Sequence, residues 1–317
     1  MRDSLRDLSA RDVQLDAIAV RVPFGGQTFR GPTFVDEGVL ARLEKMIPSS
    51  PLHLPHVMDL LVECRSAFGP VPQLLFFETA FFTHLPRREY VYGVDRDLAR
   101  ALHLRRFGFH GLYHEAACED VVRLRLLHGI QGPARILSIC LEPHPEVAAV
   151  MGGRPVYCTS GATPLEGIPG HTSCGELDPS IVLTLAHKLH WGPEQVNALL
   201  TRESGLLGLT GKRISIEDLF LSFDPALEAA RAILQHRLLQ ACGAAIAAMG
   251  GIDSIVFSGR FVTAGESLGP WLETRLTFRG GNESRPPTWH CFKEPLGRII
   301  ADRAVATLLQ QKAVKTA

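Results

Sequence analysis

Short apolar runs that alternate with helix-like stretches constrain the fold of this chain more than any other feature of its sequence. The runs Gln73–Glu78, Ala134–Leu141 and Ser254–Ser258 have the length and composition of buried strands. Helix-like stretches lie between them, such as His114–His128, with apolar residues on one face, and the Ala-rich Pro225–Met249. Because strands that alternate with helices usually pair in parallel, the sequence predicts an α/β fold with largely parallel sheets.

The remaining predicted elements continue this alternation. Further strands are expected at Asp16–Val22, Glu146–Met151 and His290–Lys293, the second of them as a hairpin partner of Ala134–Leu141. Further helices are expected at Asp36–Lys45, His56–Ala67, Asp95–Leu102, Pro179–Leu189, Pro193–Thr201, Gly269–Leu276 and Pro295–Gln311. We expect two domains, residues 1–145 and 146–317, with the boundary between residues 130 and 180. Residues 152–179, rich in Gly, Pro, Ser and Thr, are expected to form a long functional loop.

The charge balance and the apolar segments narrow the classes of protein. The chain has 317 residues, with 33 Lys and Arg against 33 Asp and Glu, so it exerts no general attraction on nucleic acid or anionic membranes. The N-terminal residues contain no signal-peptide-like stretch, and the apolar helical stretch Ala241–Met249 is too short to span a bilayer. The seven cysteines are odd in number and show no C-x-x-C spacing. We therefore expect a cytoplasmic protein with reduced thiols and neither nucleic acid nor membrane as a partner.

The densest polar cluster lies at Arg105–His114. His110 and His114 have the i, i+4 spacing of a helical zinc site, but glycines interrupt the segment and no Glu follows His110, as the metalloprotease pattern requires. Two arginines and two histidines beside flexible glycine backbone better suit an anionic oxygen ligand.

Two further patterns are weaker. The segment Gly205–Lys212 imitates a P-loop, but one residue too many separates Gly205 from Gly211, and Arg213 stands where Ser or Thr should hold magnesium. A turn that caps a helix explains it better. Glu78 places a carboxylate at the end of an apolar strand, where it is either a solvated strand end or part of a ligand or metal site.

Eight segments, taken in chain order, resemble motifs of the acetate kinase (acetokinase) family. They are Arg21–Gly26, similar to the family's R-V-V-H-G-G; Pro51–Pro55, to P-L-H-N-P; Phe77–Phe81, to F-D-T-A-F; Arg106–His114, to R-Y-G-F-H-G-T-S-H; Thr163–Gly167, identical to T-P-L-E-G; Gly175–Pro179, to G-D-I-D-P; Glu203–Gly208, which matches E-S-G-L-L-G; and Ile255–Gly259, similar to the strand before the adenosine-binding turn. The resemblance is collinear and covers about residues 12–305.

The resemblance implies a fold and a reaction. It implies two ribonuclease-H-like domains around a cleft, the first of them lacking its leading strands. The first domain would carry the acyl-substrate and phosphate-facing residues, and the second would lie on the nucleotide side. The implied reaction is phosphotransfer between ATP and acetate or another short carboxylate, with Mg²⁺ as cofactor and a homodimer as the assembly. In such chemistry the protein positions the substrates and neutralises charge on the moving phosphoryl group.

Carried over by motif, the resemblance also implies roles for individual residues. Arg21 would bind the carboxylate or acyl phosphate, Glu78 would face magnesium or phosphate, and His110 would donate a hydrogen bond to the moving phosphoryl group. The acyl pocket would be lined by Pro23, Phe109 and Pro164. The nucleotide would lie against Gly259, Gly265 and Glu266, and Glu294 would be a second magnesium-facing carboxylate.

The sequence departs from the family where phosphate should bind. The chain begins after the family's first phosphate-binding turn, and the family's glycine loop H-L-G-N-G is replaced by Leu141–Pro145. Prolines in that loop have no N–H to offer a phosphate, and Glu142 adds a like charge. The family's arginine before G-D-I-D-P aligns with Ser173, with His171 nearby as a weaker, pH-dependent substitute.

Two milder departures affect the same chemistry. Glu78 replaces an Asp and so moves its carboxylate by one methylene, and Arg260 and Phe261 intrude on the small residues of the adenosine turn. We therefore predict phosphotransfer activity that is weak or lost, unless Arg105, Arg106, Lys212 or Arg260 replace the missing groups. The alternative is a non-catalytic carboxylate-binding sensor or partner subunit.

Overall fold

The chain divides into two compact units. The computed structural model describes residues 14–51, 53–276 and 287–316. The first unit comprises Met1–Thr83 with Leu296–Ala317, and the second comprises His84–Pro295. The division expected at 145/146 falls between two strands that form one hairpin, β4 (Arg135–Cys140) and β5 (Glu146–Met151). The structure keeps those strands in one unit.

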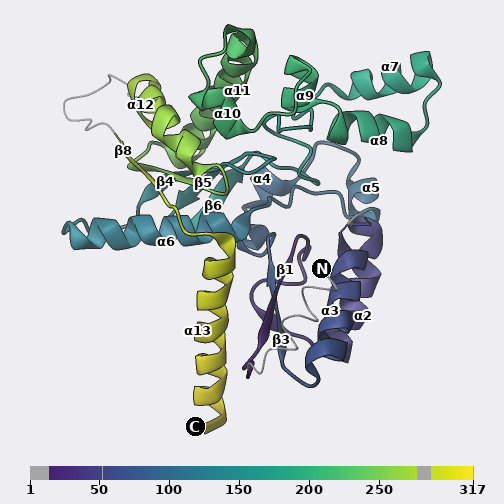
Figure 1. Cartoon of the computed structure of the whole chain (residues 1–317), viewed down its shortest axis with the longest axis vertical. Helices are drawn as coiled ribbons and strands as arrows, with labels where there is room; N and C mark the ends of the chain where they lie inside the picture. Colours follow the sequence, from purple (N-terminus) through teal and green to yellow (C-terminus); the bar gives the residue numbers. More distant parts are fainter. Residues whose placement is uncertain (1–13, 52, 277–286, 317) are drawn as a thin grey trace. The chain divides into compact units, whose positions relative to one another are not determined.

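A three-stranded sheet forms the centre of the first unit. Its order is β1 (Ile18–Val22), β3 (Gln73–Phe77) and β2 (Thr33–Phe34), with β1 parallel and β2 antiparallel to β3. Helices α2 (Glu37–Met46) and α3 (Leu54–Phe68) pack side by side (Figure 1). The other elements of the described part are η1 (Ile47–Ser49), η2 (Phe81–His84), which crosses the division, and α13 (Leu296–Thr316), which contacts β1.

A five-stranded mixed sheet forms the centre of the second unit. Its order is β6 (Arg154–Cys158), β5, β4, β7 (Ser254–Ser258) and β8 (Thr288–Cys291); β4, β7 and β8 are parallel, and β5 is antiparallel to both of its neighbours. The helices described are α4 (Arg87–Tyr90), α5 (Arg96–Ala101), α6 (Gly111–Leu127), α7 (Pro179–Leu189), α8 (Pro193–Arg202), α9 (Gly205–Thr210), α10 (Ile216–Leu221), η3 (Pro225–Leu227), α11 (Glu228–Met249), η4 (Val262–Ala264) and α12 (Gly265–Leu276).

Both faces of the five-stranded sheet are covered by helices. Alternate residues of β4, such as Leu137 and Ile139, belong to the core that α11 and α12 close, whereas Ser138 points to the other face and meets His114 of α6. Figure 1 shows α6 on the opposite side of the sheet from α11 and α12. Because both faces are buried, the central strands are almost wholly apolar, which explains the runs that the sequence displays.

Most predicted elements are found where the sequence places them. Some elements of the described residues were not predicted, because they are short or contain residues that weaken helices and strands. Strand β2 has two residues, β6 contains Pro155, and α9 contains Gly205 and Gly208. In addition, α10 has a capping box between Ser215 and Asp218, which sequence reasoning overlooked. None of the helices in the described residues combines the length and apolar character that crossing a bilayer requires.

Two phenylalanines of opposite exposure allow a test of which residues form the core. Phe257 of β7 is 0% exposed, and Phe223, after α10, is 99% exposed. We expect F257A to lower the free energy of unfolding by about 3–5 kcal/mol, because it leaves a cavity in the packed sheet. F223A should change it by less than about 0.5 kcal/mol. Urea denaturation measures both, and equal effects of the two substitutions would contradict the core described here.

Candidate active site

Arg21 and Glu78 form an ion pair at one edge of the first sheet. Strands β1 and β3 are parallel neighbours with Val22 opposite Phe77, so Arg21 and Glu78 lie at the same edge. Arg21 Nε donates to Glu78 Oε1 over 2.5 Å. Glu78 is 1% exposed, whereas the Arg21 side chain keeps 40% of its surface accessible. Arg21, which the resemblance assigns to the carboxylate substrate, is therefore bonded to Glu78, which the resemblance assigns to magnesium or phosphate.

The turn after β1 is tied to the segment after Glu78. The Gly25 N–H donates to Thr79 Oγ1 over 3.0 Å, and Pro23 is half-buried in this turn. Burial, and then the positive charge of Arg21, lowers the pKa of His53 from the P-L-H-L-P segment. The structure thus brings three of the resembling segments together around Arg21.

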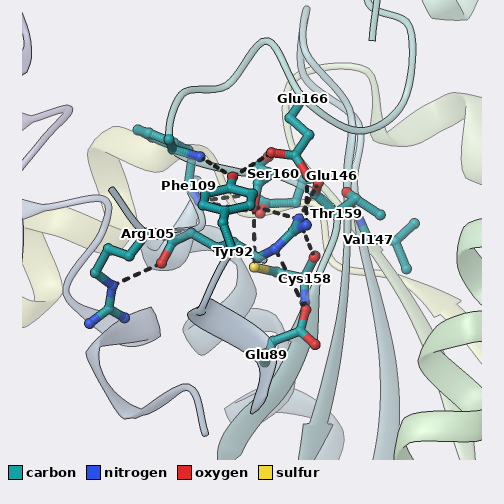
Figure 2. A network of polar contacts seen from close by, with 12 residues as sticks. Glu89, Tyr92, Arg105, Phe109, Glu146, Val147, Cys158, Thr159, Ser160 and Glu166 are labelled. Atoms are coloured by element: carbon teal, nitrogen blue, oxygen red, sulfur yellow. Dashed lines mark hydrogen bonds and ion pairs between the residues drawn. The ribbon is translucent and has the colours of Figure 1, made fainter. Parts of the chain in front are cut away.

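In the second unit, Arg106 fastens the segment before α6 to the end of β6. Its Nη1 donates to the carbonyls of Cys158, Thr159 and Ser160 over 3.2, 2.9 and 3.2 Å, and its Nη2 donates to Glu166 Oε1 over 2.6 Å (Figure 2). A guanidinium with its donors used in this way holds backbone rather than ligand.

The T-P-L-E-G loop is held by the same network. Tyr92 donates to Glu166 Oε2 over 2.5 Å and accepts the Ala162 N–H over 2.8 Å. Burial, followed by this hydrogen bond to Glu166, raises the pKa of Tyr92, so the hydroxyl remains a donor. Pro164, expected to line the acyl pocket, is half-buried in this loop, which Arg106 joins to the segment carrying Phe109.

His110 contacts the loop that replaces the family's glycine loop. His110 has a left-handed backbone, with φ of 52°, and its Nε2 lies 3.0 Å from the His144 carbonyl. Because a carbonyl only accepts, Nε2 carries the proton and donates it. His144 Nδ1 lies 2.8 Å from Ser173 Oγ. Three positions that the sequence singled out, His110, Leu141–Pro145 and Ser173, therefore lie together.

Glu142 joins the loops that follow β4 and β7. The residue is 5% exposed, its Oε1 accepts the Arg260 N–H over 2.8 Å, and its Oε2 lies 3.6 Å from Arg260 Nη2. The Leu141 N–H donates to the Ser258 carbonyl over 2.7 Å. Gly259, with φ of +97°, packs so closely that a Cβ there would lie 2.7 Å from the Leu141 oxygen. The carboxylate of Glu142 thus accepts a backbone N–H of the turn that follows β7.

The remaining nucleotide and metal candidates are surface residues or glycines. Gly265 is buried at the start of α12, whereas Glu266 is exposed and bonds to Lys293 Nζ over 2.7 Å. Glu294 is exposed, and Glu78 is bonded to the arginine described above. Within the described residues no three His, Cys, Asp or Glu side chains group to hold a metal ion. These carboxylates do not fit a magnesium site, because two of them are already bonded to cations within the chain.

The four cations considered as replacements for the missing phosphate-binding groups are engaged within the chain. Arg105 stacks over the Tyr90 ring, 3.9 Å from its centre, and Lys212 Nζ lies 3.5 Å from Asp224 Oδ2. Arg106 and Arg260 bond to the carboxylates already described. Lys212 and Arg260 remain 60% and 64% exposed in these pairs, so the pairs restrain the two side chains only weakly.

His171 does not take the place of the missing arginine. Its Nε2 accepts the Ile216 N–H over 3.0 Å at the start of α10, and its ring centre lies 4.8 Å from that of Phe261. Burial first, and then the nearby His144 and Arg260, lowers the pKa of His171 against a smaller opposing effect of Asp218. The ring is thus a neutral acceptor that caps a helix.

Sequence reasoning missed three polar residues of this region, Tyr92, His144 and Glu146. Tyr92 stands in a loop without a motif around it, and His144 lies in the loop Leu141–Pro145 that the sequence singled out but received no role there. Glu146 opens the apolar run EVAAVM directly after a proline and is 0% exposed. A single carboxylate at the start of an otherwise apolar strand is the signal that could have identified it, because such a group needs buried partners.

Comparison with solved structures identifies the class of fold to which this chain belongs. The fold resembles the crystal structure of the Porphyromonas gingivalis acetate kinase, with a TM-score of 0.78 and 25% identity over 93% of this chain and 78% of that one. It also resembles a propionate kinase from Francisella tularensis subsp. tularensis, with a TM-score of 0.81 and 23% identity over 95% and 82% of the two chains. The predicted α/β fold is confirmed, with two sheets in an arrangement that fits two-domain ribonuclease-H-like kinases.

Sequence comparison identifies the family. A model of the acetokinase family matches residues 3–266. The chain is 37% identical over 244 residues to the acetate kinase of Clavibacter michiganensis subsp. michiganensis, and 34% identical over 249 residues to that of Thermosipho africanus, over 76% and 77% of this chain. The chain therefore belongs to the acetokinase family. The match spans 61% of the length of each of these two relatives.

We expect stability to depend on pH through His171. Because its pKa is lowered in the folded protein, the folded state binds fewer protons there than the unfolded state. The contribution is complete above about pH 6.5, the ordinary histidine value, and is lost as the pH falls through the folded pKa. In H171Q an amide oxygen accepts the Ile216 N–H at every pH, so its melting temperature should fall less between neutral and acidic pH than that of the wild type. H236Q, at an exposed position, is the control, and equal slopes for all three proteins would refute the assignment.

Proposed function

We propose that this chain binds a short carboxylate or its acyl phosphate, and that its transfer of phosphate from ATP is weak or lost. The observation that carries the proposal is Glu142, whose buried carboxylate bonds to the Arg260 N–H between the loops after β4 and β7. In an open α/β sheet this is the edge at which ligands bind. The family assignment supports a carboxylate ligand, and this pairing argues against a bound polyphosphate.

The electrostatics of the β4 loop support the second half of the proposal. A phosphate at this edge would meet the negative charge of Glu142 and would have to displace it from its backbone donor. Pro143 and Pro145 supply no N–H in exchange, and the Arg260 guanidinium already faces Glu142. The magnesium and nucleotide that the resemblance implies therefore lack a fitted cradle here, and we derive no step through them.

The carboxylate side of the site supports the first half. The Arg21 side chain is 40% exposed, and its internal partner Glu78 is a carboxylate bonded over 2.5 Å in a charge-assisted pair. We propose that a ligand carboxylate exchanges with Glu78 on Arg21, and that Pro23, in the turn after β1, contacts its apolar part.

A hydroxamate assay with ATP, acetate and magnesium tests the transfer, and isothermal titration with acetate and acetyl phosphate tests the binding. We expect turnover near background, and binding at millimolar ligand that R21A and H110A abolish. The exposed Arg30 gives the control R30A, which should bind as the wild type does. Turnover that both R21A and H110A abolish would refute the loss of transfer, and absence of binding in folded wild type would refute the carboxylate site.

A further variant, E142Q, tests whether the charge of Glu142 opposes nucleotide binding. E142Q removes the negative charge and keeps an acceptor for the Arg260 N–H. Titrated with Mg–ATP, it should bind at least about tenfold more tightly than the wild type, because a like charge near the phosphates is gone. E194Q, which removes an exposed glutamate in the first turn of α8, is the matched control and should show no such gain.

We also propose that the chain forms a homodimer through α7. This helix has no buried residue, although it carries Ile181, Leu183 and Leu189, which are 43%, 70% and 47% exposed. An amphipathic helix with an uncovered apolar face suits a two-fold contact with a second copy.

Sedimentation equilibrium tests the assembly. We expect the wild type at twice the chain mass of 34.7 kDa, and L183E at the mass of one chain, because a charge at the centre of an apolar contact is not satisfied there. Leu98 of α5 is 59% exposed, so L98E is the control and should remain dimeric. A monomeric wild type, or a dimeric L183E, would contradict the proposal.

A further inference from the structure

Glu146 places a fully buried carboxylate beneath the segment that carries His110. Its Oε2 and Oε1 accept the Phe109 N–H over 3.1 and 3.2 Å (Figure 2). Its Oε2 also lies 3.7 Å from His114 Nε2. Both Glu146 and His114 are 0% exposed. A carboxylate removed from water costs several kcal/mol unless it is hydrogen-bonded, so these contacts are required for its presence there.

The partners of Glu146 all belong to the backbone turn and helix start around His110. We propose that Glu146 is a positioning residue for His110: it holds the Phe109 amide and, through it, fixes the place from which the His110 ring reaches its partner. This inference rests on the proposed function only in taking His110 to face the bound ligand.

The backbone around Phe109 needs such an anchor. Gly108 and His110 have positive φ values, 70° and 52°, so Phe109 lies between two left-handed residues. For His110 this conformation is unfavourable and persists only where surrounding contacts determine it. On the C-terminal side, the His110 carbonyl accepts the N–H groups of Tyr113 and His114 over 3.0 and 3.1 Å. On the N-terminal side, the Phe107 N–H donates to the Gly161 carbonyl over 2.9 Å, and Glu146 holds the N–H of Phe109 itself.

A buried relay ties the same carboxylate to α6 and β4. His114 Nδ1 lies 2.8 Å from Ser138 Oγ, and the Cys118 thiol hydrogen-bonds to the same serine. Burial raises the pKa of Cys118 to about 12, so this thiol stays neutral. Glu146 is itself a residue of β5 paired with Cys140 of β4, and it lies 3.7 Å from the ring that Ser138 of β4 contacts, so its position follows that of the sheet.

The His110 ring depends on the position of the Phe109 turn, because its hydrogen bond to the His144 carbonyl requires a particular direction. Nε2 donates to the His144 carbonyl over 3.0 Å, within two residues of Glu146 along the chain. One short segment, residues 144–146, thus holds both the backbone and the ring of His110. Without the Glu146 carboxylate, the Phe109 N–H loses its only described acceptors, and the turn is free to shift the ring from His144.

Hydrogen exchange of the Phe109 amide, measured by NMR in the full chain, tests the inference directly. We expect E146A to accelerate this exchange at least about tenfold, because the charge-assisted acceptor is lost. E146Q keeps one oxygen for the amide and should give an intermediate rate. The His110 Cε1–H signal in [¹³C]histidine-labelled protein should shift in E146A, with H110A used to assign it.

T159V is the matched control. Thr159 is buried, and its Oγ1 accepts the Val147 N–H over 3.0 Å, one residue further along the same strand (Figure 2). The valine keeps the shape and removes a comparable hydrogen bond without touching the Phe109 turn. Its Phe109 exchange and His110 signal should match the wild type, even if its melting temperature falls as far as that of E146A.

The outcomes separate this inference from the proposed function. Wild-type exchange and an unmoved His110 signal in folded E146A would overturn it, as would an equal change in T159V. Acetyl phosphate titration of the same proteins is the second arm, in which E146A should bind at least about tenfold more weakly and E146Q should recover part of the loss. If no variant and no wild type binds while the exchange results hold, the proposed function fails and the positioning role of Glu146 stands.

Discussion

The parallel pairing of β4 with β7 is the constraint on which the site of the second unit depends. Its register places Cys140 opposite Ser258, so the loops that follow the two strands leave the sheet from one edge. The chain then returns antiparallel as β5, which places Glu146 opposite Cys140. These two registers therefore fix where the segment 141–145 leaves the sheet and where it returns. A slip of β5 by one residue would turn Glu146 to the other face of the sheet.

Polar groups of both units bond within the chain. In the first unit Arg21 bonds to Glu78, and in the second unit Glu142 accepts the Arg260 N–H and His110 donates to the His144 carbonyl. Buried polar groups need partners, and a protein that binds a ligand usually leaves some of them for the ligand to complete. Under the proposed function, an outside carboxylate can replace Glu78 by like chemistry, whereas a phosphate would meet the like charge of Glu142.

The sequence predicts the sheets well and the partners of the site poorly. Buried central strands such as Ser254–Ser258 appear as apolar runs because both faces of the sheet are covered, and the structure finds that strand with the same bounds. The sequence did not predict the edge strand β6, because Pro155 argues against a central strand. Proline is nevertheless tolerated in an edge strand. Arg21 and Glu78, which belong to two separate motifs, lie at one edge of the first sheet. Their ion pair joins residues 57 positions apart, and that of Glu142 with Arg260 joins residues 118 apart, which no local pattern encodes.

The tethering of Glu78 beside Arg21 changes how any outside anion meets that arginine. A group attached to the same chain acts as if it were present at about millimolar concentration or above, however dilute the protein is. Under the proposed function, an outside carboxylate would compete with Glu78 for Arg21 and occupy it in proportion to its own concentration relative to this internal one. Trace amounts would leave the internal pair intact, so the site would respond only to an abundant anion.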